Sequence, residues 1–296
     1  MARPKPTDQS VQRTINKDSL MYCEHWKLTC RPFENSCAQE FYYPAESHQA
    51  TMLQLRYAIE NRRSAVLMCG ANGVGKTQVV RSMLEQLGSD YQPRAQIVFP
   101  ALKADQFVHY LVQKLVGGEE SGTPSVAADL LRFEQALSRA REDGLHPIVV
   151  VDEAHLLEGQ GVFETLRLLL NLGAGENDCE AAWTLILSGH PILLSQLERF
   201  PSLDERIAVK CVISRFTPDE TVGYIQHRVR AGGADADDIF AVTAMERIHV
   251  LTEGIPRRIN RLCDLALMVG YAEDRKLITV DLVESVHDDL VLPGAT

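Results

Sequence analysis

The most informative stretch of the sequence is Gly70-Ala71-Asn72-Gly73-Val74-Gly75-Lys76-Thr77, which matches the pattern G-x-x-x-x-G-K-[ST] in full. An apolar run, residues 64–69, precedes it, and residues 77–87 follow with the spacing of an amphipathic helix. Glycines let the backbone curl so that its N–H groups point at phosphate oxygens, and the start of the helix adds partial positive charge. We therefore predict a phosphate-binding loop between a buried strand and a helix.

Two side chains of this loop, and two that come later, are suited to a triphosphate. In this pattern Lys76 reaches the β- and γ-phosphates, and the Thr77 hydroxyl binds Mg²⁺. A second motif, Asp152-Glu153, comes directly after the apolar run 147–151. Successive side chains of a strand point to opposite faces, so the two carboxylates can have different roles. We expect Asp152 to hold Mg²⁺ through water and Glu153 to orient the attacking water.

Strands and helices alternate along the first two thirds of the chain. Short apolar runs predict buried strands, and segments with helical spacing lie between them. The strands are expected at residues 64–69, 95–99, 147–151, 183–187 and 207–213, and the helices at 47–60, 77–87, 105–116, 126–142 and 163–170. This alternation predicts an α/β fold with a doubly wound parallel sheet.

After Phe216 the pattern becomes helical, and no further strand is expected. Helices are predicted at residues 218–230, 241–252, 256–271 and 280–290. We therefore divide the chain into a flexible N-terminal arm (1–20), an α/β nucleotide-binding domain (21–213) that begins with a docking segment (21–63), and a small all-helical lid domain (214–296).

Composition and charge exclude several classes of protein. Apolar residues make up 45% and charged residues 24% of the chain, as is typical of a globular protein. No apolar run reaches 18 residues and residues 1–20 are polar, so neither a membrane span nor a secretory signal is predicted. Seven cysteines, an odd number, favour a reducing cytoplasm. The net charge of −10 argues against a surface that attracts nucleic acid everywhere, although residues 1–63 carry 9 basic and 7 acidic side chains.

The ordered set of motifs resembles the AAA+ class of P-loop ATPases. Four further segments resemble the ExeA-type ATPases (general secretion pathway protein A and its relatives): His25-Trp26-Lys27-Leu28, Arg31-Pro32-Phe33-Glu34, Leu166-Arg167-Leu168-Leu169-Leu170-Asn171-Leu172 and Gly254-Ile255-Pro256-Arg257-Arg258-Ile259-Asn260-Arg261. The resemblance implies an AAA+ sheet domain with a helical lid, and hydrolysis of ATP with Mg²⁺. It implies that the loop Gly70–Thr77, together with Gln78, Asp152 and Arg257, binds the nucleotide, and that Lys76 and Glu153 serve catalysis.

Three weaker assignments also follow from the resemblance. The residues Leu185-Ile186-Leu187-Ser188 end in Gly189-His190-Pro191, where such ATPases place a polar sensor of the γ-phosphate. Relatives commonly have glutamine where this chain has His190, so either Ser188 and His190 serve catalysis or His190 caps a turn. Arg206 is similar to the arginine finger that acts in trans, with an ordinary salt-bridge arginine as the alternative. Arg257 matches the second sensor, and the alternative is a solvated arginine.

The biological role has three candidates, all of which use the same nucleotide site. An arginine that acts in trans implies a homo-oligomer, either a ring or a filament. The first candidate is an ExeA-like accessory ATPase for secretion or pilus assembly, which uses lid and inter-subunit motion to remodel a protein partner. Full-length secretion members continue into a membrane span and a peptidoglycan-binding region, whereas this chain stops at Thr296. We therefore expect a cytoplasmic protein, or one held at the inner membrane by a partner.

The second candidate is a DNA-binding AAA+ ATPase that assists a transposase. It predicts ATP-dependent assembly on duplex DNA with steep salt dependence. The third candidate is a nucleotide-dependent switch that does not hydrolyse ATP, against which the intact pair Asp152-Glu153 argues.

Overall fold

The computed structural model describes residues 22–34, 39–117, 125–157, 161–173 and 180–291, and the expectations for residues 1–20 lie outside these ranges. The chain divides into two compact units. Of the described residues, those within 44–216 together with Ile255–Arg257 form one unit, the sheet unit, and those within 22–43, 217–254 and 258–291 form the other, the helical unit. Within the described ranges, none of the helices has the length and apolar character needed to cross a lipid bilayer.

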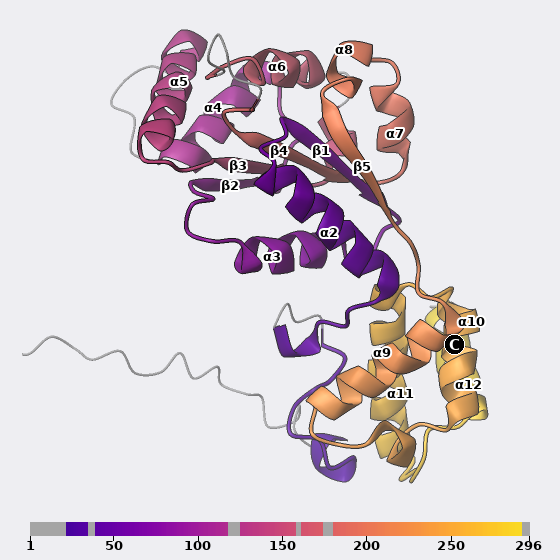
Figure 1. Cartoon of the computed structure of the whole chain (residues 1–296). Coiled ribbons are helices and arrows are strands. Elements are labelled where there is room, and N and C mark those ends of the chain that lie inside the picture. Colours follow the sequence, from indigo (N-terminus) through magenta and orange to yellow (C-terminus); the bar gives the residue numbers. More distant parts are fainter. Residues whose placement is uncertain (1–21, 35–38, 118–124, 158–160, 174–179, 292–296) are drawn as a thin grey trace, which may run out of the picture. The chain divides into compact units, whose positions relative to one another are not determined.

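The sheet unit is built on five parallel strands in the order β2-β3-β4-β1-β5 (Figure 1). The strands are β1 (Ala65–Gly70), β2 (Arg94–Ile97), β3 (Ile148–Val151), β4 (Thr184–Gly189) and β5 (Ile207–Ile213). Strand β1 is an interior strand and is fully buried, and it pairs in parallel with β4 on one side and β5 on the other. Because all strands run the same way, their carboxyl ends share one edge of the sheet, which is where ligands of such sheets bind.

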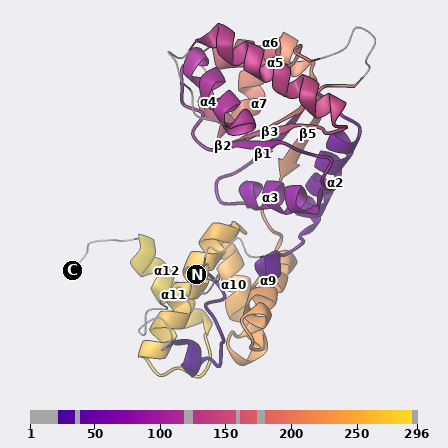
Figure 2. The same ribbon diagram turned by 90° about the vertical axis from the view of Figure 1, so that its left-hand side faces the viewer.

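Helices cover both faces of this sheet, as a doubly wound fold requires (Figures 1 and 2). Alternate residues of β1 enter two separate cores: Leu67 belongs to one, and Val66 and Met68 belong to the other. The Leu67 core includes α4 (Ala104–Val116), α5 (Val126–Glu142), α6 (Val162–Leu169), α7 (Ile192–Leu197) and α8 (Pro201–Asp204). The Val66 and Met68 core includes α2 (Glu46–Glu60) and α3 (Lys76–Gln86).

The elements differ from the sequence-based expectation mainly at their ends. β2 stops at Ile97, where its pairing with Val151 ends, and leaves Val98 and Phe99 64% and 62% exposed although they are apolar. The short helices α7 and α8, and the 3-10 helix η2 (Ala154–Leu157), were not expected. Each has six residues or fewer, which is too short for a clear period. Most of the chain between the helices expected at residues 105–116 and 126–142 lies outside the described residues.

The helical unit contains α9 (Pro218–Ala231), η3 (Ala236–Asp238), α10 (Val242–Thr252), α11 (Pro256–Ala272) and α12 (Val280–Val291), and η1 (Gln39–Phe41) also packs on α9. The first helix begins with a capping box, in which Thr217 Oγ1 accepts from Glu220 N and the Glu220 carboxylate accepts from Thr217 N. Helix α10 packs against α9 and α12. These four long helices are the ones that the sequence predicted after Phe216.

The segment 22–43 packs with the helical unit, whereas the sequence analysis assigned residues 21–63 to the sheet domain. Trp26 is buried, and its Nε1 donates to the carbonyl of Leu267 at 3.0 Å. The hydroxyl of Tyr22 donates to Asp264 Oδ1 at 2.8 Å. The physical reason is the aromatic content of the segment, because its large rings gain free energy by covering apolar helix surface. The remaining part, residues 44–63, lies in the sheet unit and forms α2.

Candidate functional site

The loop between β1 and α3 has the backbone shape that its glycines permit. Gly73 has φ +84° and Gly75 has φ +101°, backbone conformations that residues other than glycine adopt only with strain. Helix α3 begins at Lys76, so its first N–H groups face the inside of the loop. The loop therefore offers the N-terminal end of a helix and a curled backbone to an anion.

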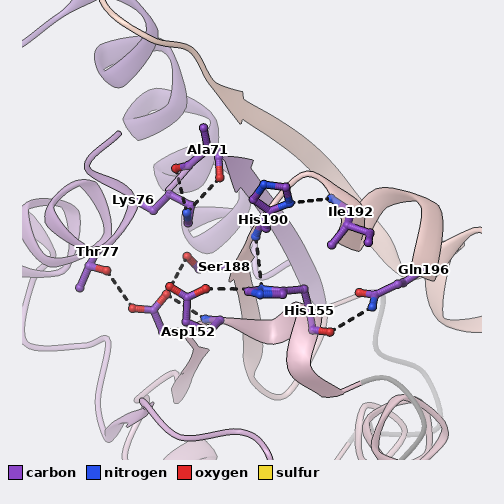
Figure 3. Close-up of polar contacts among 11 residues, drawn as sticks. Ala71, Lys76, Thr77, Asp152, His155, Ser188, His190, Ile192 and Gln196 are labelled. Carbon is purple, nitrogen blue, oxygen red and sulfur yellow. Dashed lines mark hydrogen bonds and ion pairs between the residues drawn. The ribbon is translucent and has the colours of Figure 1, made fainter. Parts of the chain in front are cut away.

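Lys76 is buried inside this loop. Its exposed fraction is 6%, and Nζ donates to the carbonyls of Gly70 at 3.0 Å and Ala71 at 3.2 Å (Figure 3). Burial lowers the pKa of Lys76, and the carboxylates of Glu153 and Asp152 oppose that shift. The ammonium group is thus held near two acidic side chains at the carboxyl edge of the sheet.

Asp152 joins three elements at the same edge. Its Oδ2 accepts from Thr77 Oγ1 at 2.8 Å, and its Oδ1 accepts from Ser188 Oγ at 3.1 Å and from Glu153 N at 3.0 Å. The hydroxyl of α3 and the carboxylate that follows β3 thereby lie side by side. A hydroxyl and a carboxylate are the oxygen donors that Mg²⁺ prefers, so these residues fit a magnesium ion.

Glu153 has an unusual backbone conformation for a residue with a side chain. Its φ is +50°, in the left-handed region, because the chain turns sharply from β3 into η2. The side chain is 44% exposed, and Oε2 lies 3.4 Å from His155 Nδ1. The two adjacent acids therefore have different environments: Asp152 is buried and hydrogen-bonded, whereas the carboxylate of Glu153 is accessible.

The end of β4 and the residue that follows it lie beside this acidic pair. Ser188 is buried and contacts Asp152, whereas His190 Nδ1 accepts from the backbone N–H of Ile192 at 3.4 Å. That contact lies within the turn that leads into α7, and it is the contact expected if His190 caps a turn, the alternative to a role as a sensor. The backbone N–H of His190 donates to His155 Nδ1 at 3.4 Å (Figure 3).

Arg257 also lies at the phosphate loop, as part of the short segment Ile255–Arg257 that groups with the sheet unit. Its backbone N–H donates to the carbonyl of Gly73 at 3.2 Å. A Cβ atom added to Gly73 would lie 2.9 Å from the Cβ of Arg257. The positive charge of Arg257 contributes to the lowered pKa of Lys76.

Of the predicted site residues, Arg206 lies away from the loop, whereas Gln78 follows Thr77 in the first turn of α3 with its side chain directed along the helix. Arg206 directly precedes β5, and its carbonyl accepts from Ser64 Oγ at the start of β1. It therefore lies at the amino edge of the sheet, about 20 Å from the carboxyl edge at 3.3 Å per strand residue. Gln78 lies on α3, and its Nε2 donates to Ser82 Oγ at 3.4 Å on the next turn.

Sequence reasoning missed one residue that supports the loop from behind. His48 in α2 is buried, and its Nε2 N–H donates to the carbonyl of Val74 at 2.8 Å. A Cβ on Gly75 would lie 3.1 Å from the same nitrogen, which is a second reason for glycine there. No spacing in the sequence relates residue 48 to residue 74, so nothing in the pattern signals this contact.

Comparison with known proteins gives one family match and one similar sequence. A family model described as an AAA domain matches residues 59–197. The chain is similar to general secretion pathway protein A of Aeromonas hydrophila, with 31% identity over 277 residues that cover 92% of this chain and 48% of that protein. The chain thus spans about half the length of this curated relative.

Solved structures with a similar fold include Cdc6p from Pyrobaculum aerophilum (TM-score 0.69, 18% identity, 90% of this chain and 72% of that chain). They also include the Aeropyrum pernix ORC2 protein in ADPNP–ADP complexes (TM-score 0.65, 16% identity, 90% and 72%). A third is the Aeropyrum pernix ORC1 protein in complex with DNA (TM-score 0.61, 17% identity, 82% and 64%). At such identities the similarity concerns the fold alone.

Proposed function

Because the chain is an AAA+ P-loop protein of the type of general secretion pathway protein A, we propose that it binds ATP with Mg²⁺ at Gly70–Thr77 and hydrolyses it to ADP and phosphate. The observation that carries this proposal is the convergence of Lys76, Thr77, Asp152 and Glu153 at one edge of the sheet. They come from the connections that follow β1 and β3, which bring a phosphate-binding loop and a pair of carboxylates together.

Each residue has a definite part in the proposed reaction. The backbone N–H groups of the loop and Lys76 bind the phosphates. Thr77 and Asp152 hold Mg²⁺, which when bound neutralises charge on the phosphate oxygens. Glu153, with its accessible carboxylate, orients the attacking water and takes up its proton. Ser188 holds the carboxylate of Asp152 through its hydroxyl.

Three residues complete the proposed site. Arg257 lies at the loop and contacts the γ-phosphate, and His190 serves as a polar sensor at the end of β4. Arg206 lies at the opposite edge of the sheet from its own loop, so it is proposed to act on a neighbouring subunit. A homo-oligomer, either a ring or a filament, follows from that arrangement.

Steady-state release of phosphate from ATP tests the proposal. We expect turnover by the wild type in Mg²⁺, and none in excess EDTA. Lys76→Ala removes the ammonium group that binds the phosphates, so this variant is expected to lose turnover and most of its affinity for ATP. Normal turnover by Lys76→Ala would show that the reaction takes place elsewhere.

The use of the hydrolysis energy is a second, separate proposal. The similarity to general secretion pathway protein A extends over 92% of this chain, which favours an accessory ATPase that remodels or assembles a protein partner. The alternative, an ATPase that acts on DNA in the service of a transposase, draws support from the ORC1 protein, a protein of similar fold whose structure contains DNA.

Duplex DNA distinguishes these two uses. ATPase activity is measured with and without DNA from about 50 to 200 mM salt, the range over which counterion release changes DNA affinity most clearly. Unchanged activity at every salt concentration is expected for the protein-remodelling role. Strong stimulation that disappears as the salt concentration rises would favour the DNA-directed role instead.

A further inference from the structure

His155 lies at the carboxyl ends of the neighbouring strands β3 and β4, next to Asp152 and Glu153. It belongs to η2, which follows β3 after Asp152 and Glu153, and its carbonyl accepts from Gln196 Nε2 of α7 at 3.0 Å. A Cβ on Gly189, the last residue of β4, would lie 3.3 Å from His155 N and 3.4 Å from Nδ1. Both the backbone and the imidazole of His155 therefore lie against the end of β4 (Figure 3).

One ring nitrogen of His155 faces two different partners. Nδ1 is 3.4 Å from the carboxylate oxygen Oε2 of Glu153 and 3.4 Å from the backbone nitrogen of His190. The carboxylate can only accept a hydrogen bond, and the peptide N–H can only donate one. Nδ1 has either a proton or a lone pair, so it can form one of these hydrogen bonds at a time.

Glu153 has few other restraints. Its backbone is fixed in the left-handed region at φ +50°, but its carboxylate is 44% exposed. Among the residues that the structure describes, His155 is the one cationic or potentially cationic side chain within ion-pair distance of this carboxylate. The imidazole is therefore the group that can decide where the accessible carboxylate points.

We infer that His155 is a positioning residue for Glu153, and that it links the orientation of this carboxylate to the end of β4. With the proton on Nδ1, His155 donates to Glu153 and holds it. With the proton on Nε2, Nδ1 accepts from His190 N–H and releases Glu153. A small shift of the end of β4, where His190 is proposed to sense the γ-phosphate, thereby determines whether His155 donates a hydrogen bond to the carboxylate of Glu153. This inference rests on the proposed ATP hydrolysis.

The test compares three substitutions of His155 in the full chain. His155→Ala removes Nδ1, and we expect kcat to fall about tenfold while KM and ATP affinity change less than about twofold, because Glu153 does not bind the nucleotide. His155→Asn places an amide group at the position of Nδ1 and is expected to restore most of kcat. His155→Gln places its amide near the position of Nε2 and is expected to restore less. His287→Ala, in α12, is the matched control and keeps wild-type turnover.

A double variant separates positioning from a general effect on folding. If His155 acts through Glu153, the loss caused by His155→Ala disappears in a Glu153→Gln background, and the double variant has the residual rate of Glu153→Gln alone. Unchanged kcat in His155→Ala, or a loss that Asn does not restore better than Gln, overturns this inference while leaving the proposed hydrolysis intact. Full turnover by Glu153→Gln overturns the proposed hydrolysis mechanism and this inference together.

Discussion

At the scale of single residues, the charged side chains of the site are held in place by hydrogen bonds to neighbouring groups. Asp152 accepts three hydrogen bonds, from Thr77, Ser188 and Glu153, which fixes its carboxylate before any ligand arrives. Lys76 is buried against carbonyls of its own loop. A charged group held by such preformed contacts needs little rearrangement when phosphate and metal bind, and this favours electrostatic catalysis.

Thr77 gives a first prediction about the metal. Thr77→Ala removes a proposed Mg²⁺ ligand and one of the hydrogen bonds to Asp152, whereas Thr77→Ser keeps the hydroxyl. We expect ATP affinity in Mg²⁺ to fall about tenfold in Thr77→Ala and to stay near wild type in Thr77→Ser. The affinity is measured by fluorescence titration with and without EDTA. An equal loss for Thr77→Ala in EDTA would mean that the hydroxyl does not act through the metal.

His146 gives a prediction about pH and stability. Burial, with a smaller contribution from the charge of Arg62, lowers its pKa from 6.5 to about 4, and its Nε2 donates to Thr184 Oγ1. The unfolded chain takes up a proton near pH 6.5 and the folded chain does not, so stability is complete above pH 6.5 and falls as the pH decreases toward 4. The loss between pH 7 and pH 5 is about 2 kcal/mol.

Urea unfolding at pH 7 and pH 5 measures this loss. In His146→Gln, which keeps a donor without a titrating group, we expect a smaller difference between the two pH values. The control His287→Gln, at a half-buried site in α12, should keep the wild-type difference. An identical pH dependence in His146→Gln and the wild type would assign the effect to other groups.

At the scale of elements, the sequence predicted all five strands and the long helices because their apolar periods are regular. The apolar run before Asp152 and the amphipathic pattern of 126–142 are examples, and α5 has the predicted bounds. The short helices α7 and α8 were missed because one or two turns do not establish a period. The packing of Trp26 with the helical unit was missed because aromatic residues in an irregular segment do not indicate which surface they will cover.

For the candidate site too, the sequence predicted the parts that are continuous motifs and missed the contacts between distant or loop residues. Gly70–Thr77 and Asp152-Glu153 are continuous motifs, and the sequence was sufficient to bring them to one edge of a parallel sheet. The contacts of His48 with Val74 and of His155 with Glu153 depend on the geometry of loops. No spacing rule covers such geometry, so they required a structure.

Gly73 gives a prediction for the loop as an element. Gly73→Ala puts a side chain at φ +84° and 2.9 Å from the Cβ of Arg257, so we expect a loss of stability of about 1–2 kcal/mol and weaker ATP binding. Gly88→Ala is the matched control, since a Cβ there meets nothing within 4 Å. Thermal unfolding and nucleotide titration measure both effects. Equal behaviour of the two variants would contradict the tight fit of the loop.

At the scale of the whole molecule, the parallel sheet separates Arg206 from the site. Arg206 is at the amino edge, and the phosphate loop is at the carboxyl edge. Among the described residues, no hydrogen bond or ion pair of its guanidinium group is found. An arginine in this position can serve a nucleotide only on another copy of the chain, which makes assembly part of the proposed mechanism.

Mixing two inactive variants tests this arrangement. Arg206→Ala subunits retain Glu153, and Glu153→Gln subunits retain the arginine, so a mixed oligomer contains some complete sites. An equal mixture is expected to recover about a quarter of the wild-type rate if each site uses one neighbour. Mixing Arg206→Ala with the double variant Arg206→Ala/Glu153→Gln should recover nothing. Full activity of Arg206→Ala alone would remove the arginine from the mechanism.

The central claim is that this edge of the sheet hydrolyses a bound nucleotide, and Glu153→Gln tests it most directly. Because Gln keeps the shape of the side chain but cannot accept a proton, this variant should bind ATP as tightly as the wild type. Phosphate release in a single turnover, with protein in excess over ATP, should then be at least about a hundredfold slower than in the wild type. Equal rates of phosphate release at equal occupancy would contradict the account.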